Sequence, residues 1–543
     1  MIDENARLLS KKAKEALKEL GTWLMLNRIA LLCAMLLGTV VHFPLFVKAL
    51  VNPDSLSYTD FYLAGTWEYQ LGRWGLPLID AVFGGPVPLC LASVMSLALL
   101  ALAGVVICDT LDITSGVGRT LACCLLCISP YVAVTLTYYY CSRAYALAYL
   151  LTACALRVVT SARVSKPSWL GATAMMIFAL SLYQTSIDIA LVLLLFATLL
   201  LPLLRGKGSV ADFVGLMLRG VWLAFCLAAY YVLARVFLLL GGLEFATYGG
   251  ASSIGLASTL MALPSTLREL YRQFGVMLLG TSVARNAFRI RWADAGIVAL
   301  FGVLLVRGIL GGRAQRRLDE GMVPRALMAA FALLALPLAC NFVCLFAHDN
   351  DLAMRMTPAY YLTVVCMVLG VIDLLALTLA QEGTTLRNAG TLAAYACSLL
   401  LVWGYASQVS TDYLVMSAKE RDAEQLVERI QSTADQYRLD NGTTGAVIVL
   451  GHPSKGNFPF SVAGEELSDS FAHQTYFWDL ESTTCGSWHH LARYALGTEM
   501  NTCGEEYYQS LLATPQIQSM SLYPAQGSVM EYEGNIVVKV ADV

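Results

Sequence analysis

Charged residues are scarce in this sequence. They account for 14% of the 543 residues, and the two signs nearly cancel, which leaves a formal net charge of -3. Without a basic excess, nothing in the composition points to a nucleic-acid partner. No internal repeat is evident, which counts against a transporter, because many transporters are built from inverted repeats. A cleavable signal is also missing, because the first apolar block, 23–46, is too long for one and no small-residue cleavage site follows it.

Apolar residues, by contrast, are abundant and lie in long blocks. Hydrophobic residues make up 57% of the chain and its mean hydropathy is +0.62, which exceeds what a soluble core needs. Uncharged apolar blocks of about 18 residues or more are typical of membrane-spanning helices. We therefore predict a polytopic α-helical membrane protein with about eleven spans. The predicted spans are 23–46, 87–108, 119–138, 144–160, 168–183, 187–204, 213–240, 293–311, 326–347, 359–380 and 390–408. The fourth, fifth and sixth are short, and one of them is a candidate for a broken or re-entrant helix.

Lysine and arginine near the span ends set the expected orientation. A Lys-rich amphipathic segment precedes the first span, and the connections after even-numbered spans hold most of the other basic residues. We therefore predict a cytoplasmic amphipathic helix at 1–22, a membrane domain at 23–408 and an extracytoplasmic soluble domain at 409–543. One external connection, 241–292, departs from this pattern because it contains several arginines.

The C-terminal part of the chain is more polar than the rest. Residues 417–439 predict a polar amphipathic helix, while GAVIVLG and NIVVKVADV predict a buried strand and a closing strand, so we expect a small α/β or α+β domain. Cys485 and Cys503 lie in this region with His489 and His490, at a spacing that matches no compact zinc motif. A disulfide is favoured in an external domain, with free thiols as the alternative.

The first external loop, 47–86, is long and rich in aromatic residues, whereas a plain linker would be polar and rich in Gly and Ser. Its composition predicts helices lying in the membrane interface, with Trp67, Tyr69 and Trp74 at head-group depth.

Asp54 is our candidate general base. It follows Asn-Pro just outside the first span, where a carboxylate can meet an acceptor hydroxyl at a place partly shielded from water. The structural alternative is that Asp54 caps a helix beginning near Ser55, and both roles can hold together. Asp60 follows in the same loop, at a spacing that would not share a helical face with Asp54.

Two further segments place polar residues at an outer membrane edge. The run TYYYCSR contains Tyr139 and Arg143; an aromatic belt explains the tyrosines, but Arg143 has no partner nearby in sequence. The run SLYQTSIDIAL contains Tyr183, Gln184 and Asp188 at an outer turn, where ionisable groups are costly and often functional. A purely structural hydrogen bond is an equally good account of Gln184.

Arg143 is a candidate for holding a phosphate, and two later regions supply further cationic candidates. Arg268 and Arg272 lie either on an amphipathic surface helix that meets anionic head groups or on a patch that faces a lipid-linked phosphate. Arg355, close to the start of the next span, is placed to offset charge on a phosphate leaving group. The preceding HDND run (348–351) resembles a ligand set for a hard metal only loosely, so a divalent metal is an open alternative and no cofactor is certain.

Three of these segments, in this order, resemble a known family. NPDSLSYTDFYLAGTWEYQLGRWGLPL, then SPYVAVTLTYYYCSRAYALAYLL, then SLYQTSIDIAL are similar to the bacterial integral-membrane glucosyltransferases of the O-antigen-modifying (Gtr) kind, which belong to the GT-C class of polytopic glycosyltransferases. The likeness covers most of 20–410. The tail resembles the outer domain that Gram-positive members append.

The resemblance implies transfer of a hexose, glucose in the first place, from a polyprenyl-phosphate donor to a cell-surface glycan or glycopolymer at the outer face of the bacterial plasma membrane. It implies that Asp54 is the base; the second, adjacent acidic residue of the family is missing here or moved to Asp60. Arg73 and Trp74 match the Gly-Arg segment of the family, and Tyr183-Gln184 match its Tyr-Gln pair. Substrate-binding roles for these residues follow from the resemblance, and we add Tyr139 to them.

Two other functions compete with this one. A transporter or flippase of lipid-linked sugars would carry charges near the middle of its spans, whereas most charges here lie at span ends. A non-catalytic envelope protein that presents the tail would need residues 409–543 but not Asp54.

Overall fold

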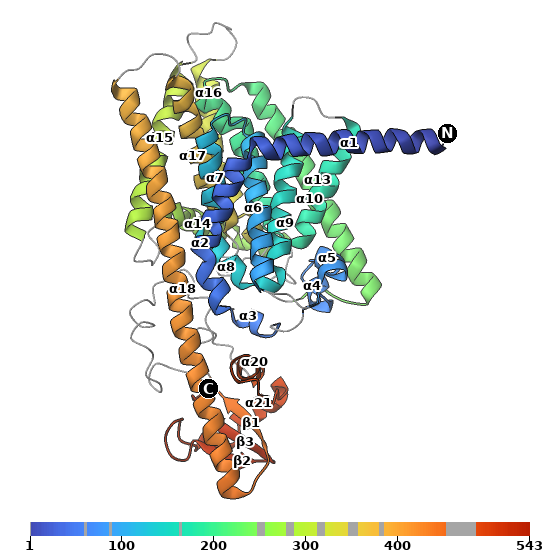
Figure 1. Ribbon diagram of the computed structural model, residues 1–543, viewed down its shortest axis with the longest axis vertical. Helices are drawn as coiled ribbons and strands as arrows, with labels where there is room; N and C mark the ends of the chain where they lie inside the picture. Colours follow the sequence, from blue (N-terminus) through green and yellow to red (C-terminus); the bar gives the residue numbers. More distant parts are fainter. Residues whose placement is uncertain are drawn as a thin grey trace.

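The computed structural model combines a large helical bundle with a small α/β unit, and one long helix joins them (Figure 1). The structure describes residues 2–50, 52–58, 62–85, 89–161, 165–246, 256–278, 287–311, 321–345, 357–379, 385–451 and 485–542. The first helix, α1 (Ile2–Leu26), lies across one end of the bundle, and the α/β unit, the tail domain, lies beyond the other end. We call these the α1 end and the tail end.

The prediction of a polytopic helical membrane protein is confirmed. Within the described ranges, nine helices are long and apolar enough to cross a membrane, or ten if one bent pair counts as a single span. The nine contain α2 (Arg28–Lys48), α6 (Leu89–Thr110), α9 (Tyr139–Thr160), α11 (Ser186–Leu195) continued by α12 (Leu201–Leu204), α13 (Val210–Gly241), α15 (Ala287–Gly311), α16 (Met322–Cys340), α17 (Pro358–Leu379) and α18 (Thr385–Asn441). The predicted span at 168–183 forms α10 (Lys166–Leu182), which has 17 residues.

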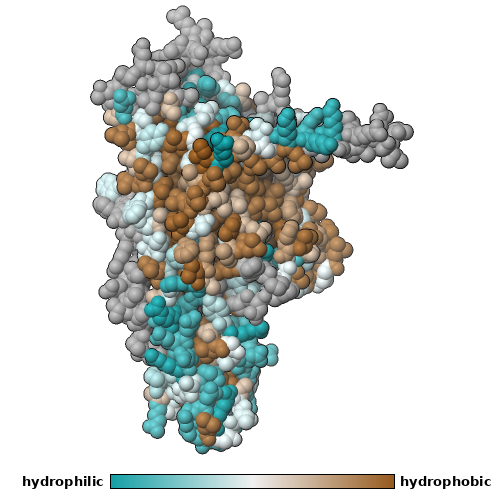
Figure 2. Space-filling view, in the orientation of Figure 1, coloured by the Kyte–Doolittle hydropathy of each residue, from teal (hydrophilic) through white to brown (hydrophobic). Residues whose placement is uncertain are grey.

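The surface of the bundle has the apolar character that a bilayer requires. Figure 2 shows a band of hydrophobic residues across the face of the bundle that is in view, bounded by hydrophilic residues on α1 and on the tail domain. Side chains in this band are large, apolar and exposed, for example Leu218 at 66% and Val221 at 69%. A soluble protein rarely exposes a continuous apolar surface of this extent.

The broken span is the third rather than the fourth, fifth or sixth. Helices α7 (Gly116–Cys127) and α8 (Pro130–Thr137) meet at a bend of 42°. Pro130 is the cause, because a proline has no N–H to continue the ladder and favours the first position of a new helix. The sixth span is continuous but includes a π-helical turn at Phe196–Leu200.

Two ion pairs link elements at the α1 end. Trp23, near the end of α1, donates from Nε1 to Asp109 Oδ2 at 2.7 Å, and Asp109 also pairs with Arg119 at 2.7 Å. Arg205 pairs with the buried Asp373 at 3.0 Å. These bonds tie α1 and the connections of the α1 end together.

Helix α18 continues from the bundle into the tail domain without a break. The predicted span 390–408 and the predicted polar helix 417–439 are therefore parts of one helix of 57 residues, and the domain boundary we placed after residue 408 falls inside it. An apolar segment in the membrane and an amphipathic segment outside it can share one helical backbone, because the backbone hydrogen bonds are satisfied within the helix in both surroundings.

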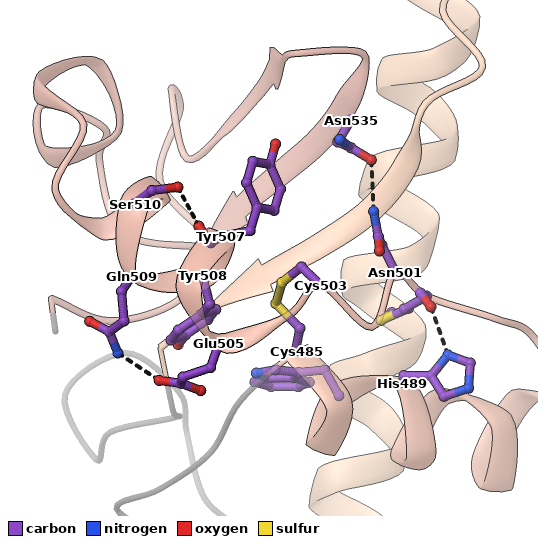
Figure 3. The surroundings of a disulfide bond; sticks show 12 residues. Cys485, His489, Asn501, Cys503, Glu505, Tyr507, Tyr508, Gln509, Ser510 and Asn535 are labelled. Carbon is purple, nitrogen blue, oxygen red and sulfur yellow. Dashed lines mark hydrogen bonds between the residues drawn. A yellow bond between two sulfur atoms is a disulfide. The ribbon is translucent and has the colours of Figure 1, made fainter.

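The tail domain is a small sheet covered by helices. Strands β1 (Ala446–Leu450), β2 (Val529–Tyr532) and β3 (Asn535–Lys539) follow the order β1-β3-β2, with β1 parallel and β2 antiparallel to β3. The two strands predicted from GAVIVLG and NIVVKVADV are thus confirmed. The helices are α20 (Cys485–Leu496), α21 (Glu505–Leu512) and α22 (Pro515–Gln518). A disulfide joins Cys485 to Cys503, with Cα atoms 5.9 Å apart (Figure 3).

Candidate functional site

The loop between α2 and α6 folds into three short helices at the tail end. They are α3 (Pro53–Leu56), α4 (Thr66–Gln70) and α5 (Gly75–Phe83), and Figure 1 shows α3 on the side of the bundle that faces the tail domain. Most of our candidate residues lie in this loop or in the helix ends around it.

Asp54 is not the cap of α3. That role belongs to Asn52, whose side-chain oxygen accepts a hydrogen bond from the Ser55 N–H at 2.8 Å, so the capping alternative for Asp54 is wrong. Asp54 lies in the first turn and is exposed. Its carboxylate has no hydrogen bond or ion pair with any residue that the structure describes, which leaves both oxygens available to accept a proton.

The other carboxylates of the loop are used to build it. The buried Glu68 accepts hydrogen bonds from Tyr62 Oη at 3.0 Å and from the Gly65 N–H at 2.7 Å. Asp80 accepts one from the Ala64 N–H at 3.0 Å, and its burial raises the pKa of the carboxyl above the ordinary value. Asp60 lies outside the described residues. In the described part of the loop, Asp54 is therefore the one carboxylate left free.

Arg73 is held by residues of the two later segments that resemble the family. Its Nη1 donates to Tyr145 Oη at 3.0 Å and its Nε donates to Gln184 Oε1 at 3.4 Å. The rings of Tyr145 and Tyr183 stack with centroids 4.0 Å apart, and the guanidinium lies 5.9 and 5.4 Å from them. No carboxylate within the described ranges pairs with this partly buried cation.

The Gly-Arg turn and the Tyr-Gln pair, which lie far apart in sequence, thus form one cluster. Gln184 also donates to the Leu71 carbonyl at 2.7 Å and to Tyr230 Oη at 3.1 Å. Gly72 has a φ of +75°, and an added Cβ would lie 2.7 Å from Tyr230 Oη. Only glycine fits this backbone and this close approach, which explains the residue before Arg73.

Trp74 is buried inside the protein, and its position at head-group depth stays a prediction. Its ring stacks on Phe237 at 5.1 Å and packs against Phe178 at 6.3 Å, so it supports the Arg73 turn from inside the protein. Tyr69 also packs against Phe237 and is partly buried. Trp67, at 48% exposure, is the residue of the predicted interface group that does face outward.

The tyrosines at the start of α9 do not form an aromatic belt. Tyr140 packs with Tyr58 and Tyr62 at centroid distances of 4.7 and 4.6 Å, and the buried Tyr139 donates to the Tyr58 carbonyl at 2.6 Å. Burial, together with the charges of Glu68 and Asp54, raises the pKa of Tyr58. The tyrosines therefore hold the external loop instead of facing lipid.

This tyrosine cluster connects the two candidate reactive groups. Tyr140 packs against Tyr58, which lies four residues after Asp54, and Tyr145 on the same helix accepts a hydrogen bond from Arg73. A free carboxylate and an uncompensated guanidinium therefore flank one aromatic cluster at the tail end.

Three other cationic candidates, Arg143, Arg268 and Arg272, have no described contact with Arg73. Arg143 reaches the Phe83 carbonyl at 3.5 Å, near Asp80. Arg268 and Arg272 are exposed on α14 (Leu256–Leu278), which packs against α16 and α17, and Arg272 is paired with Glu269. Arg355 and the HDND run lie outside the described residues. Across the part of the chain that is described, no group of three His, Cys, Asp or Glu side chains forms a metal site.

Three residues of this region were not predicted from the sequence as parts of the site. Tyr145 and Tyr230 fix Arg73 and Gln184, but each is one tyrosine in an apolar helix and gave no signal of its own. Arg235, near the end of α13, is exposed, donates to Tyr231 Oη at 3.1 Å and lies 4.9 Å from the Phe245 ring. Arg235 could have been predicted as a site residue, because a lone arginine in the second half of an apolar span is costly and often functional.

The fold and the site define a polytopic membrane protein. At its tail end, among the described residues, the Asp54 carboxylate has no hydrogen bond or ion pair and the Arg73 guanidinium has no carboxylate partner. The family model for glucosyl transferase GtrII matches residues 43–372, more than half of the chain. The protein therefore belongs to the GtrII family and is a glucosyltransferase, as the resemblance to the Gtr kind predicted. The matched region contains the whole site described above and ends inside α17, before α18 and the tail domain. No curated protein matches the chain.

Proposed function

We propose that this glucosyltransferase moves glucose from a polyprenyl-phosphate donor to a cell-surface glycan or glycopolymer, at the face of the membrane that carries the tail domain. The observation that carries the proposal is the state of Asp54, an exposed carboxylate without a hydrogen bond or ion pair among the described residues, on the loop that also holds Arg73.

The reaction is a single displacement with inversion at the anomeric carbon. Asp54 takes the proton of the acceptor hydroxyl as that oxygen forms its bond to the sugar. The bond to the donor phosphate breaks, and its electron pair leaves with the lipid phosphate. Arg73 donates to the phosphate oxygens, where negative charge develops. Tyr145 and Gln184 hold the guanidinium in place before the donor arrives, which keeps the cost of ordering it low.

Two features support an extracytoplasmic position for the site. The lysines of α1 lie at the opposite end of the bundle, and basic residues favour the cytoplasmic side. The tail domain contains the Cys485–Cys503 disulfide, and disulfides persist mainly in oxidising compartments. A polyprenyl donor lying in the outer leaflet would place its sugar phosphate at this level.

The test is Asp54→Asn in the full-length protein, purified in detergent and supplied with radiolabelled polyprenyl-phosphate-glucose and a cell-envelope glycan fraction. Loss of the base should lower transfer by about 10²- to 10⁴-fold, with expression and thermal stability unchanged. Asp112→Asn is the matched control, because Asp112 is an exposed carboxylate at the α1 end. Wild-type transfer by Asp54→Asn would remove Asp54 from the mechanism. Because detergent abolishes any gradient, transfer under these conditions also excludes a transporter.

A further inference from the structure

Helix α3, which carries Asp54, is too short to be stable alone. It has four residues, and short helices persist only when tertiary contacts hold them. On the bundle side, Asn52 Nδ2 donates to Thr137 Oγ1 at 3.2 Å and Ser55 Oγ donates to the Thr137 carbonyl at 2.8 Å. These two bonds fix one flank of α3 to the end of α8.

The other flank of α3 is buried in the tail domain. Leu56, its last residue, is 8% exposed and belongs to the apolar core that Trp488 and Leu491 of α20 form with Leu426 and Val427 of α18. Figure 1 shows α20 directly beyond α3. Covering a leucine in this way removes apolar surface from water and so helps to hold the two parts together.

A polar contact reinforces this packing. Tyr494 Oη, near the end of α20, lies 3.0 Å from the Ala49 carbonyl and 3.0 Å from Glu420 Oε1 on α18. Ala49 is the left-handed residue that caps the end of α2, with a φ of 51°, and it lies four residues before the start of α3 at Pro53. The neighbouring Lys48 donates from Nζ to Ser417 Oγ at 2.6 Å. The chain is thus held by the tail domain both before and after Asp54.

We propose that the tail domain is a structural part of the active site, with Tyr494 and Leu56 as positioning residues that fix α3 and thereby the Asp54 carboxylate. This rests on the proposed function of Asp54. It goes beyond family membership, because the GtrII match covers α3 but neither α18 nor the tail domain.

The main test is Tyr494→Phe, which keeps the packed ring and removes the hydroxyl. The matched control is Tyr507→Phe in the same domain, because Tyr507 donates to Glu533 Oε2 at the same distance, 3.0 Å, but lies on α21, away from α3. With polyprenyl-phosphate-glucose and the envelope glycan fraction, Tyr494→Phe should lower kcat about tenfold, since small displacements of reacting groups are costly. KM for the donor should stay unchanged, and Tyr507→Phe should leave kcat unchanged.

Hydrogen exchange separates positioning from general loss of stability. Tyr494→Phe and Leu56→Ala should speed exchange in the peptide that contains α3 while leaving the bundle helices as in the wild type. If Leu56→Ala does not fold, the kcat and the hydrogen exchange of Tyr494→Phe alone test the positioning role. Wild-type kcat and exchange in Tyr494→Phe, together with an inactive Asp54→Asn, would overturn the positioning role and leave the proposed function standing. An active Asp54→Asn would instead overturn the proposed function.

Discussion

The two ends of the bundle differ in whether the charged groups described above form ion pairs. At the α1 end, Asp109 pairs with Arg119 and Asp373 with Arg205. At the tail end, Asp54 and Arg73 have no charged partner among the described residues. Arg73 is partly buried, and such a charge without a charged partner costs stability, so it is kept where a ligand completes it. Asp54 is exposed, so an acceptor can reach it. The comparison indicates that one end is built to hold the fold together and the other to hold a substrate.

The largest effect on the tail end, after Asp54→Asn, is expected from Arg73→Lys. Lysine keeps the charge but cannot reproduce the planar fork that Tyr145 and Gln184 hold. Transfer should fall about a hundredfold, the usual cost of losing a preorganised donor to a developing anion, with KM for the donor raised. Arg157→Lys, an exposed arginine at the α1 end, serves as the control. Equal activity in both variants would show that Arg73 does not bind the donor.

At the α1 end, Arg205→Ala should change stability and not chemistry. It leaves Asp373, whose side chain is 2% exposed, without its cation. Removing one partner of a buried pair costs about 3–5 kcal/mol, which thermal unfolding in detergent will show as a large drop in Tm. The kcat of the protein that remains folded should match the wild type. A lower kcat at unchanged Tm would mean that the two ends are not divided as we describe.

The contact between the tail domain and α3 should depend on pH through Glu420, which lies in the part of α18 beyond the predicted span. Burial raises the pKa of this carboxyl from 4.5 to about 8, with Glu424 raising it further and Tyr494 and Lys48 lowering it. The folded state therefore holds a proton that the unfolded chain releases, so stability should fall as pH rises from about 4.5 to about 8 and then level off. In Glu420→Gln this fall in Tm should be smaller. Identical pH profiles would exclude Glu420 as the cause.

The smallest effect is expected from Arg268→Gln. Arg268 is exposed on α14, and no described contact brings it to Arg73. Transfer should change by less than about twofold, because a surface charge contributes little. A loss as large as that of Arg73→Lys would assign α14 to the donor site after all.

The sequence predicted the features that repeat along the chain and missed those that depend on distant contacts. Apolar blocks identify spans because every spanning helix must be apolar over its length. The Gly-Arg and Tyr-Gln segments were recognised from the family resemblance. Their direct contact, through Arg73 and Gln184, became visible only in the fold.

The wrong predictions involve residues that suit two environments equally well. A tyrosine has an apolar ring and a polar hydroxyl, so the sequence fits Tyr139 and Tyr140 equally well at the membrane interface and in a buried cluster. Asn52 and Asp54 both make good helix caps, and local sequence does not say which of them the backbone uses. The bond from Tyr494 to Ala49 joins residues 445 positions apart, a separation at which no local pattern carries information.

The continuous α18 also sets the height and the rotation of the tail domain above the membrane. A helix advances by about 1.5 Å and turns by about 100° for each residue, so the register between Tyr413, which bonds His42 inside the bundle at 2.7 Å, and Glu420, which meets Tyr494, is fixed. Inserting a single residue between them would swing α20 away from α3 while each domain kept its own core. The length of α18 between the bundle and α20 therefore determines how far the tail domain stands from the bundle and which side of it faces α3.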